Sequence, residues 1–500
     1  MVSVSANPPE DAEFKEKYAV QGAEVIVAEK SGNGLYCVNE PAVSEELKVL
    51  YRYLMASLYY SVKPTAEAMD PMKYLEETMK TTASELNVVD AVQRNMDALR
   101  YFIKRDVTGY GVLDTPMKDA RVEEVECGGF NVPLTVVHRD YTEYLHLETN
   151  VQLDTEEKVR EMVQKFAQRA GKSVTVAYPF TDFLLPEGHR GAVTYSKEIS
   201  LPGSTFDIRK FPEEPLTVTN LMASGTLSSL LVAYYWLLQE HRAFSIIIGP
   251  VSAGKTTLMN VLLSMLRQDA KILTVEDTPE LRLVHPNWVR FITRSAYSIS
   301  GRDIGLFDLV KLSLRYRPDY LSLGEVRGEE VQSLVQAAAV GHGALTTFHA
   351  DSPESALVRL MSPPLSVGQS FIMLIWTFMK MTRVTTKQGT QVRRAAEVTE
   401  LIPEGTPESP YKLKRVFQWK ASDDTIYPTS PEELVSSSYR LEEVRQQRGW
   451  TKAELLDELK GRKALLEGLL ADRTFGYRDV AARVFAYYKE RQGSSKKEAA

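Results

Sequence analysis

The chain of 500 residues is 44% hydrophobic and 25% charged, which is the profile of an ordinary soluble globular protein. This length exceeds what one hydrophobic core supports and predicts about two to four folding units. The formal net charge of −6 argues against a protein that coats nucleic acid, because such proteins usually carry a basic stripe. We therefore expect no direct nucleic-acid partner, although a local basic channel stays compatible with this charge.

Cysteine content and hydropathy favour a cytoplasmic protein. Cys37 and Cys127 are too few for a disulfide framework and lack the CxxC spacing of a zinc site, so both are expected to be reduced thiols. No segment reaches the about 18 uninterrupted apolar residues of a transmembrane helix. The first residues lack the basic start and apolar stretch of a signal peptide. Any membrane association is then expected to come through a partner.

The first part of the chain, residues 1–100, is predicted to be a largely helical amino-terminal region. Its start is mixed, and the run Ser31-Gly-Asn-Gly34 indicates a hairpin. Further on, Leu50, Leu54 and Leu58 recur at the four-residue spacing of an amphipathic helix.

Residues 101–211 are predicted to form an α+β domain. Short β-like runs occur at Val132–Val137 and Val174–Tyr178, and a helix is expected at Thr155–Ala170. The domain is followed by the stretch Phe-Pro-Glu-Glu-Pro, whose prolines favour extended backbone. We therefore predict an interdomain linker over 212–225.

Residues 226–430 alternate between strand-like and helical runs, which predicts a doubly wound, mostly parallel α/β sheet. The expected strands are Ser245–Ile248, Lys271–Val275, Tyr320–Leu323 and Ala344–Phe348, and the expected helices are Leu227–Glu240, Leu306–Leu314 and Glu329–Val340. Residues 431–492 are predicted to be a helical carboxy-terminal lobe. Within it, Thr451-Lys-Ala-Glu454 has the pattern of a capping box at a helix start. Residues 493–500 are predicted to be a frayed tail.

The run Gly249-Pro-Val-Ser-Ala-Gly-Lys-Thr-Thr257 has the spacing of a phosphate-binding loop. An apolar strand precedes it and a helical run follows it, as the motif demands, which disfavours a fortuitous Gly-rich turn. Its backbone N–H groups would cradle phosphate oxygens at a helix N-terminus. Lys255 would contact the β- and γ-phosphates, and the Thr256 hydroxyl would ligate magnesium. The predicted nucleotide-binding residues of this loop are Gly249, Ser252, Ala253, Gly254, Lys255, Thr256 and Thr257.

Two further strands end in carboxylates, at Glu276-Asp277 and at Glu325. The carboxyl ends of strands line the ligand crevice of an open α/β sheet, so these acids are expected beside the phosphate loop. We assign Glu276 to polarise the attacking water and Glu325 to hold the magnesium shell, directly or through water. The exchanged assignment stays open. The alternative, in which each glutamate only caps the turn that follows it, is weak for two such residues together.

Histidines and arginines complete the candidate site. His342 and His349 flank the strand Ala344–Phe348, and His349, at its carboxyl end, is the better candidate to sense the γ-phosphate. A guanidinium on the transferring phosphate often comes from a neighbouring subunit. The candidates after the loop, each of which also suits a surface ion pair, are Arg290, Arg294, Arg315, Arg317 and Arg327. Arg209 lies just before the linker, from where an upstream domain could reach over a nucleotide.

Taken together, these motifs resemble the type II/type IV secretion ATPase superfamily, and most closely its archaeal branch of archaellum and type IV pilus assembly ATPases. The resemblance is carried in order by GPVSAGKTT, TVEDTPEL, LSLGEVRGEE and GHGALTTFHADS. Upstream, the run from Tyr110 to Gly129 and the run from Gly203 to Phe211 resemble the amino-terminal domain of that family. The tetracysteine zinc module of many bacterial members is absent from the sequence.

This resemblance implies a RecA-like P-loop ATPase domain with a smaller α+β domain before it and a helical lobe after it. It also implies a homohexamer at the inner face of the cell membrane that holds ATP and magnesium between its two domains and moves a polytopic membrane platform protein. By resemblance, the nucleotide-site positions are Lys255, Thr256, Glu276, Glu325 and His349, and the phosphate-sensing or interface arginines are Arg209, Arg290 and Arg294.

Three functions compete on these residues. The first is a motor that assembles pilin-like filaments or drives type II-like secretion. The second is a motor for DNA transfer or effector secretion, which uses the same motifs. The third is a scaffold that binds ATP without cycling, against which the retained Glu276, Glu325 and His349 count.

Overall fold

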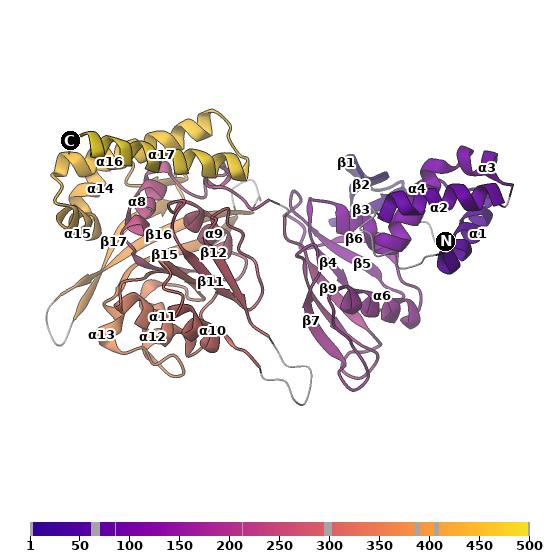
Figure 1. Cartoon of the computed structure of the whole chain (residues 1–500), viewed down its shortest axis with the longest axis horizontal. Coiled ribbons are helices and arrows are strands. Elements are labelled where there is room, and N and C mark those ends of the chain that lie inside the picture. Colours follow the sequence, from indigo (N-terminus) through magenta and orange to yellow (C-terminus); the bar gives the residue numbers. More distant parts are fainter. Residues whose placement is uncertain are drawn as a thin grey trace. The chain divides into compact units, whose positions relative to one another are not determined.

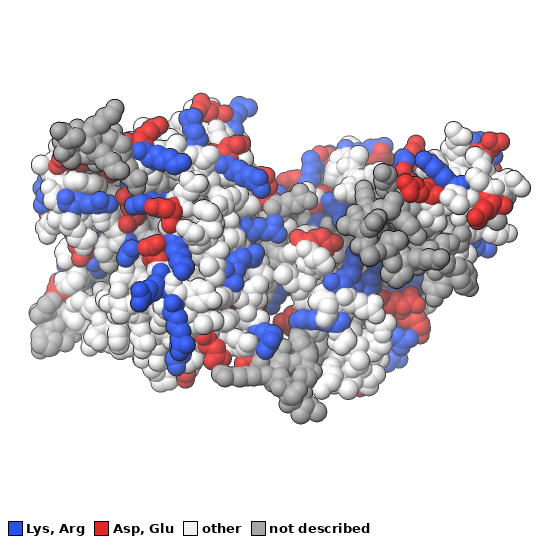
Figure 2. All heavy atoms as spheres, in the orientation of Figure 1, with Lys and Arg blue, Asp and Glu red and all other residues white. Residues whose placement is uncertain are grey.

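The computed structural model describes residues 4–61, 71–85, 87–212, 214–294, 303–385, 391–404 and 410–498. The chain divides into two compact units, Met1–Pro212 and Glu213–Ala500 (Figure 1). On the face drawn in Figure 2, acidic and basic side chains both occur over each unit. Within the described residues, no helix combines the length and the apolarity that crossing a membrane requires.

The first unit is built on a nine-stranded sheet in the order β1-β2-β3-β6-β5-β4-β9-β8-β7. Its strands are β1 (Glu13–Val20), β2 (Ala23–Lys30), β3 (Asn33–Asn39), β4 (Val122–Cys127), β5 (Pro133–His138), β6 (Leu147–Gln152), β7 (Phe180–Leu184), β8 (Arg190–Thr194) and β9 (Thr205–Arg209). Neighbouring strands are antiparallel, except that β3 and β6 are parallel. Helix α6 (Glu156–Arg169) contributes Val159, Val163 and Phe166 to the core of this sheet.

Four helices of the first unit form a separate small core: α1 (Glu45–Ser61), α2 (Pro71–Glu85), α3 (Val89–Arg94) and α4 (Met96–Ile103). The expectation of a largely helical region over 1–100 is therefore wrong for β1, β2 and β3, which join the main sheet. The predicted hairpin is confirmed between β2 and β3. Ser31 and Gly32 both have positive φ, 51° and 84°, as a two-residue turn that matches the twist of the strands requires.

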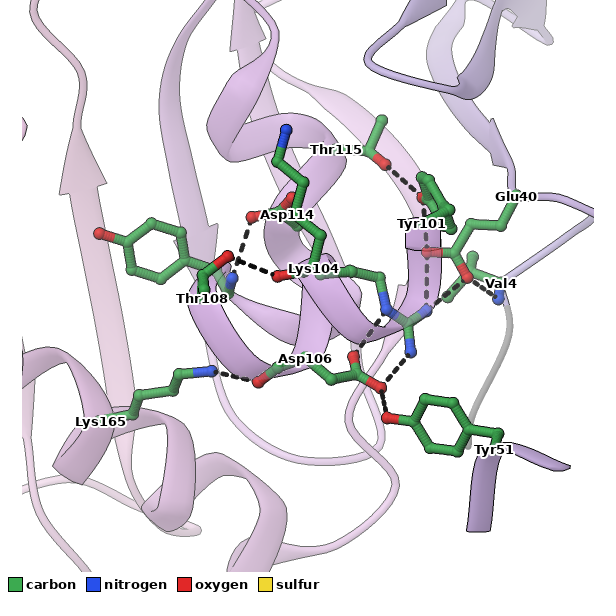
Figure 3. A network of polar contacts seen from close by, with 12 residues as sticks. Val4, Glu40, Tyr51, Tyr101, Lys104, Asp106, Thr108, Asp114, Thr115 and Lys165 are labelled. Atoms are coloured by element: carbon green, nitrogen blue, oxygen red, sulfur yellow. Dashed lines mark hydrogen bonds and ion pairs between the residues drawn. The ribbon is translucent and has the colours of Figure 1, made fainter. Parts of the chain in front are cut away.

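A buried ion pair joins the helical part of the first unit to the chain segments beside it (Figure 3). Arg105 follows α4 in a π-turn (Lys104–Thr108), and its guanidinium lies 2.6 Å from the Glu40 carboxylate, with both side chains at most 2% exposed. Glu40 also accepts hydrogen bonds from the backbone N–H of Val4 and from the Tyr101 hydroxyl. Asp106 accepts from Arg105, and from the Tyr51 hydroxyl of α1 at 2.5 Å. These bonds compensate the cost of removing the charges from water.

Short helical turns η2 (Gly111–Leu113) and α5 (Asp114–Lys118) precede β4. The predicted β-like run Val174–Tyr178 is wrong. It is a tight turn in which Thr175 and Tyr178 exchange two backbone hydrogen bonds of 3.1 Å, which leaves too few residues between them for a strand. Cys37 and Cys127 are both buried and form no disulfide.

The second unit also contains a nine-stranded sheet, in the order β12-β11-β13-β14-β10-β15-β16-β17-β18. Its strands are β10 (Phe244–Ile248), β11 (Ile272–Glu276), β12 (Trp288–Ile292), β13 (Tyr320–Leu323), β14 (Gly343–Phe348), β15 (Ile375–Thr385), β16 (Gln391–Pro403), β17 (Tyr411–Lys420) and β18 (Thr425–Tyr427). The pairs from β12 through β15 are parallel, and those from β15 to β18 are antiparallel. The prediction of a mostly parallel sheet is confirmed, whereas the antiparallel extension was not foreseen.

Helices cover both faces of this sheet, as the doubly wound prediction required. Along β10, Ile247 belongs to the core beneath α8 (Ser229–Glu240) and α9 (Lys255–Ser264), whereas Ile246 and Ile248 belong to the core on the other face. That second face is covered by α10 (Leu306–Leu314), α11 (Glu330–Ala339), α12 (Pro353–Met361) and α13 (Gln369–Ile372) (Figure 1). A strand buried on both faces is therefore apolar at consecutive positions.

The carboxy-terminal helices are α14 (Pro431–Ser437), α15 (Tyr439–Arg448), α16 (Lys452–Ala471) and α17 (Tyr477–Glu498). The predicted capping box at Thr451 is confirmed at the start of α16. These helices share one core with α8 and α9, and the indole N–H of Trp236 on α8 donates to the Tyr488 hydroxyl of α17 at 2.6 Å. The lobe is thus part of the second unit. The predicted frayed tail 493–500 is wrong up to Glu498, because α17 continues to that residue.

The boundary between the two units falls at the start of the predicted linker. The linker prediction over 212–225 is wrong for α7 (Val218–Ala223), which packs into the core of the second unit. Thr217 and Asn220 form a capping box that opens this helix, and the two prolines lie before the cap, where extended backbone does not interfere with the helix.

Candidate nucleotide-binding site

The motif-bearing strands β11, β13, β14 and β10 lie side by side in the parallel part of the second sheet. Their ends are aligned, since Val275 pairs with Leu323 and Ile248 pairs with Phe348. The phosphate loop therefore begins at the same edge of the sheet at which Glu276 closes β11 and the Glu325 and His349 segments follow β13 and β14. The structure brings the four predicted motifs together.

Two positions of the loop require glycine. Gly249 has φ +145°, and a Cβ there would lie 2.3 Å from the backbone oxygen of Met381 on β15. Gly254 has φ +88° and stands at the start of α9. Ser252 also has a positive φ, 59°, although it carries a side chain. The loop is consequently wound tightly against β15 before it enters the helix.

Lys255 opens helix α9, and its ammonium group lies within the loop. Its Nζ donates to the carbonyl oxygens of Gly249 at 2.9 Å and of Pro250 at 2.7 Å. A third contact, of 3.2 Å, joins Nζ to Nδ1 of His349. Burial lowers the pKa of Lys255, and the nearby Glu325 carboxylate opposes this effect.

His349 connects Lys255 to Glu325. Its Nε2 lies 2.8 Å from the Glu325 carboxylate, and Nδ1 faces the lysine ammonium. An ammonium can only donate, so Nδ1 accepts and Nε2 carries the proton that Glu325 receives. Burial, with a smaller effect from Lys255, lowers the pKa of His349 and so favours the neutral form of the ring. Glu325 is further held by the Arg327 guanidinium at 2.6 Å.

Glu276 is the most deeply buried acid of the site, with 2% of its surface exposed. Its Oε1 accepts the backbone N–H groups of Glu280 and Leu281, each at 2.9 Å, whereas the buried Oε2 has no partner among the described residues. Burial raises the pKa of Glu276 to about 7, against the opposing effect of the two N–H donors. A carboxylate with a pKa near the working pH and one unpaired oxygen suits a general base.

Gly324 explains how Glu276 fits. A Cβ on Gly324 would lie 3.2 Å from Cγ of Glu276, which is closer than most Cβ atoms approach a neighbouring atom. The glycine before Glu325 therefore leaves room for the other carboxylate. This pairing of Gly324 with Glu276 follows from the adjacency of β11 and β13 and has no signal in either motif alone.

The remaining predicted residues lie at different distances from this centre. Ala253 is buried in the loop, and Thr256 and Thr257 are half-buried in the first turn of α9. Arg290 on β12 stacks over Trp288 and lies near enough to Glu276 to favour its ionised form. Arg294 pairs through its backbone with Ile304. Arg315 and Arg317 follow the end of α10 in the chain.

Two predicted residues lie away from the loop. His342 precedes β14 and so lies at the amino end of that strand, opposite to the phosphate loop. Arg209 belongs to the first unit, on β9, where its guanidinium lies 3.7 Å from Glu124. Its proposed reach over a nucleotide stays a prediction, as do the assigned roles of the site residues as a set.

Magnesium, which the motifs imply, finds suitable donors at this edge of the sheet. The Thr256 hydroxyl and the Glu325 carboxylate offer the oxygen ligands that Mg²⁺ prefers. Among the described residues, no group of three His, Cys, Asp or Glu could by itself hold a metal ion.

One residue beside the loop was missed by the sequence analysis. Arg393 on β16 donates from Nε to the carbonyl oxygen of Ser252 at 3.0 Å. Arg393 lies 138 positions after Lys255 and belongs to none of the motifs, so only the pairing of β15 and β16 beside the loop reveals it.

The fold and the site thus define a P-loop protein with a RecA-like, doubly wound α/β domain. Residues 139–392 match the family model described as type II/IV secretion system protein, and the chain belongs to this family. A relative in Methanocaldococcus jannaschii, the uncharacterized protein MJ0900, is 29% identical over 442 residues, 88% of this chain and 78% of its own. A second uncharacterized protein of that organism, MJ1287, is 34% identical over 275 residues, 55% of this chain and 99% of its own.

A more distant relative is the putative conjugal transfer protein Rv3659c of Mycobacterium tuberculosis. It is 30% identical over 218 residues, which are 42% of this chain and 62% of that protein. Among solved structures, the pilus retraction motor PilT with bound ADP is 16% identical and has a TM-score of 0.40. That match covers 68% of this chain and 89% of PilT.

Proposed function

We propose that this protein is a magnesium-dependent ATPase whose hydrolysis cycle drives a membrane-associated assembly or secretion machine. The observation that carries the proposal is the buried Glu276, which has a pKa raised to about 7 and an unpaired oxygen. It lies at the end of β11, in the same parallel part of the sheet as β10, which leads into the phosphate loop. A site that only bound nucleotide would not need such a carboxylate. Membership of the secretion family supports the same activity.

Each residue has a separate task in the proposed reaction. The loop N–H groups and the ammonium of Lys255 hold the β- and γ-phosphates, and Lys255 exchanges its bonds to the Gly249 and Pro250 carbonyls for phosphate oxygens. Oε2 of Glu276 accepts a proton from the attacking water, while Oε1 stays fixed by two backbone N–H groups. Magnesium, when bound, would neutralise phosphate charge, and Thr256 and Glu325 are the residues that would hold it.

His349 bridges the ammonium group of Lys255 and the carboxylate of Glu325. Because it accepts from Lys255 and donates to Glu325, movement of the lysine toward a γ-phosphate removes one of its two partners. His349 is thereby placed to respond to the nucleotide, which supports the γ-phosphate sensor role. The exchange of roles between Glu276 and Glu325 is disfavoured by the exposure of Glu325, whose side chain is 22% exposed and paired to Arg327.

The test uses the purified full-length chain with ATP and magnesium. The wild type is expected to release phosphate, and Lys255→Ala is expected to abolish turnover. Glu276→Gln should bind ATP and ADP as the wild type does but hydrolyse ATP at a small fraction of its rate. Undiminished turnover in Lys255→Ala would refute the site. Binding without turnover in the wild type, with the membrane partner present, would favour the non-cycling scaffold instead.

We further propose that the protein acts as a homohexamer at the cytoplasmic face of the membrane, where it moves a polytopic platform protein to assemble pilin-like filaments, either a type IV pilus or an archaellum. The family membership and the relatives in an archaeon support this role. A motor for DNA transfer or effector secretion is the second candidate, favoured by the relative described as a putative conjugal transfer protein. Mass measurement with a nonhydrolysable nucleotide tests the ring, and only monomers at micromolar concentration would contradict it. Neighbouring genes for pilin-like proteins would favour filament assembly, and genes for DNA processing would favour transfer.

A further inference from the structure

The phosphate loop is contacted by a side chain that belongs to none of the motifs. Arg393 lies on β16, and its Nε donates to the Ser252 carbonyl oxygen at 3.0 Å. Its Cδ would be 3.3 Å from a Cβ built on Gly254, so the aliphatic stem packs against the loop as well. The guanidinium thus binds the loop through the carbonyl group of Ser252, whereas phosphates bind to N–H groups.

Ser252 occupies a backbone conformation that needs support. Its φ of 59° lies in the left-handed region, which is unfavourable for a residue with a Cβ. A residue held there persists when its surroundings fix it. The hydrogen bond from Arg393 is charge-assisted and therefore stronger than one between neutral groups. It acts on the carbonyl of Ser252 itself, at the point where the loop turns toward Gly254.

Arg393 is itself fixed by the strand that carries it. Strand β16 is paired with β15, where Arg383 lies opposite Arg393. The next residue, Arg394, is buried and binds both carboxylate oxygens of Asp424 at 2.7 Å and the Ser224 carbonyl oxygen at 2.9 Å. The backbone at Arg393 is therefore anchored on both sides, and its side chain can hold the loop at a set distance.

We propose that Arg393 is a positioning residue for nucleotide binding, which keeps Ser252 in its left-handed conformation and so preorganises the N–H groups of the phosphate loop. This inference rests on the proposed nucleotide site and adds to it a residue from the antiparallel part of the sheet. Preorganisation acts on bound ATP, bound ADP and the transition state alike. Its loss should therefore weaken binding and leave the rate of the bound complex nearly unchanged.

The first experiment measures the Kd of ADP, and kcat and KM for ATP, on the full-length chain. Arg393→Ala is expected to raise both Kd and KM about five- to tenfold, as the loss of one hydrogen bond to a charged, exposed group implies, with kcat within about twofold. The matched control is Arg383→Ala, which removes the guanidinium directly opposite on β15 and should leave Kd and KM within about twofold. Equal Kd values for Arg393→Ala and the wild type would overturn the inference.

A second background separates positioning of the loop from direct contact with the nucleotide. In Ser252→Gly the left-handed conformation carries no steric penalty, so Arg393→Ala should cost less than about twofold there. The same five- to tenfold loss in both backgrounds would overturn the inference, because it would place the guanidinium on the nucleotide or on the fold. The midpoint of thermal unfolding without nucleotide should fall by no more than about 4 °C in Arg393→Ala, because one exposed hydrogen bond is lost, and a larger fall would place the role in the fold and overturn the inference.

These outcomes stay distinct from the failure of the proposed function. If the wild type binds no ADP, the nucleotide site itself is refuted. If the wild type binds ADP, Lys255→Ala does not, and Arg393→Ala binds like the wild type, the nucleotide site stands and the positioning role alone is refuted.

Discussion

The acid–base state of Glu276 gives the sharpest prediction about this protein. Its pKa is raised to about 7 by burial, so Glu276 is mostly protonated at pH 6 and mostly ionised at pH 8. A general base acts in its ionised form, and kcat/KM for ATP should therefore rise with pH and level off above about 7 to 8. Glu276→Gln keeps an oxygen for the N–H groups of Glu280 and Leu281 but cannot accept a proton. Its kcat should fall about 10²- to 10⁴-fold.

The same shift makes a separate prediction for stability. The pKa of Glu276 rises from 4.5 in the unfolded chain to about 7 in the folded one, so the folded state binds this proton more tightly. The free energy of unfolding should then decline as the pH rises from about 4.5 to about 7, by about 3 kcal/mol from this residue. Glu276→Gln should lack that decline.

Both predictions are checked on the purified chain, by phosphate release from pH 5.5 to 9 and by urea unfolding from pH 4 to 9. The matched control is Asp277→Asn, which neutralises the adjacent exposed carboxylate and should preserve the rate and the pH profile. A Glu276→Gln variant that retained more than about a tenth of the wild-type kcat, or a wild-type rate with no inflection near pH 7, would refute the assignment of Glu276 as the base.

Three other changes have expected outcomes. Gly324→Ala places a Cβ 3.2 Å from Cγ of Glu276 and should lower kcat about tenfold while ADP still binds, whereas an unchanged rate would show that the carboxylate moves aside freely. Gly249→Ala forces a Cβ to 2.3 Å from a backbone oxygen of β15 and should abolish ADP binding in a titration, and retained affinity would contradict the tight loop. Arg105→Leu leaves the buried Glu40 unpaired and should destabilise the first unit by about 3–5 kcal/mol in urea unfolding, and a loss under about 1 kcal/mol would contradict the burial of this ion pair.

Local sequence patterns were sufficient for the central strands and for the motifs. The strand Tyr320–Leu323 and the helix Leu306–Leu314 were predicted with the bounds that the structure has. The strand-end placement of Glu276 also followed from an apolar run that closes on acids. Patterns failed where longer-range pairing decides, as in β1 to β3. There the strands are stabilised by each other and by β6, which lies more than 100 residues later in the chain.

The sequence by itself determined which groups take part in the proposed chemistry, since a phosphate loop, two acids and a histidine follow short apolar runs that predict buried parallel strands. Only the tertiary structure decided their relations: that His349 joins Lys255 to Glu325, that Gly324 makes room for Glu276, and that Arg393 holds the loop. The physical reason is that motifs are local and are read from chain-neighbour spacing. Contacts across a sheet instead depend on strand order and register, which are set by the packing of the whole core.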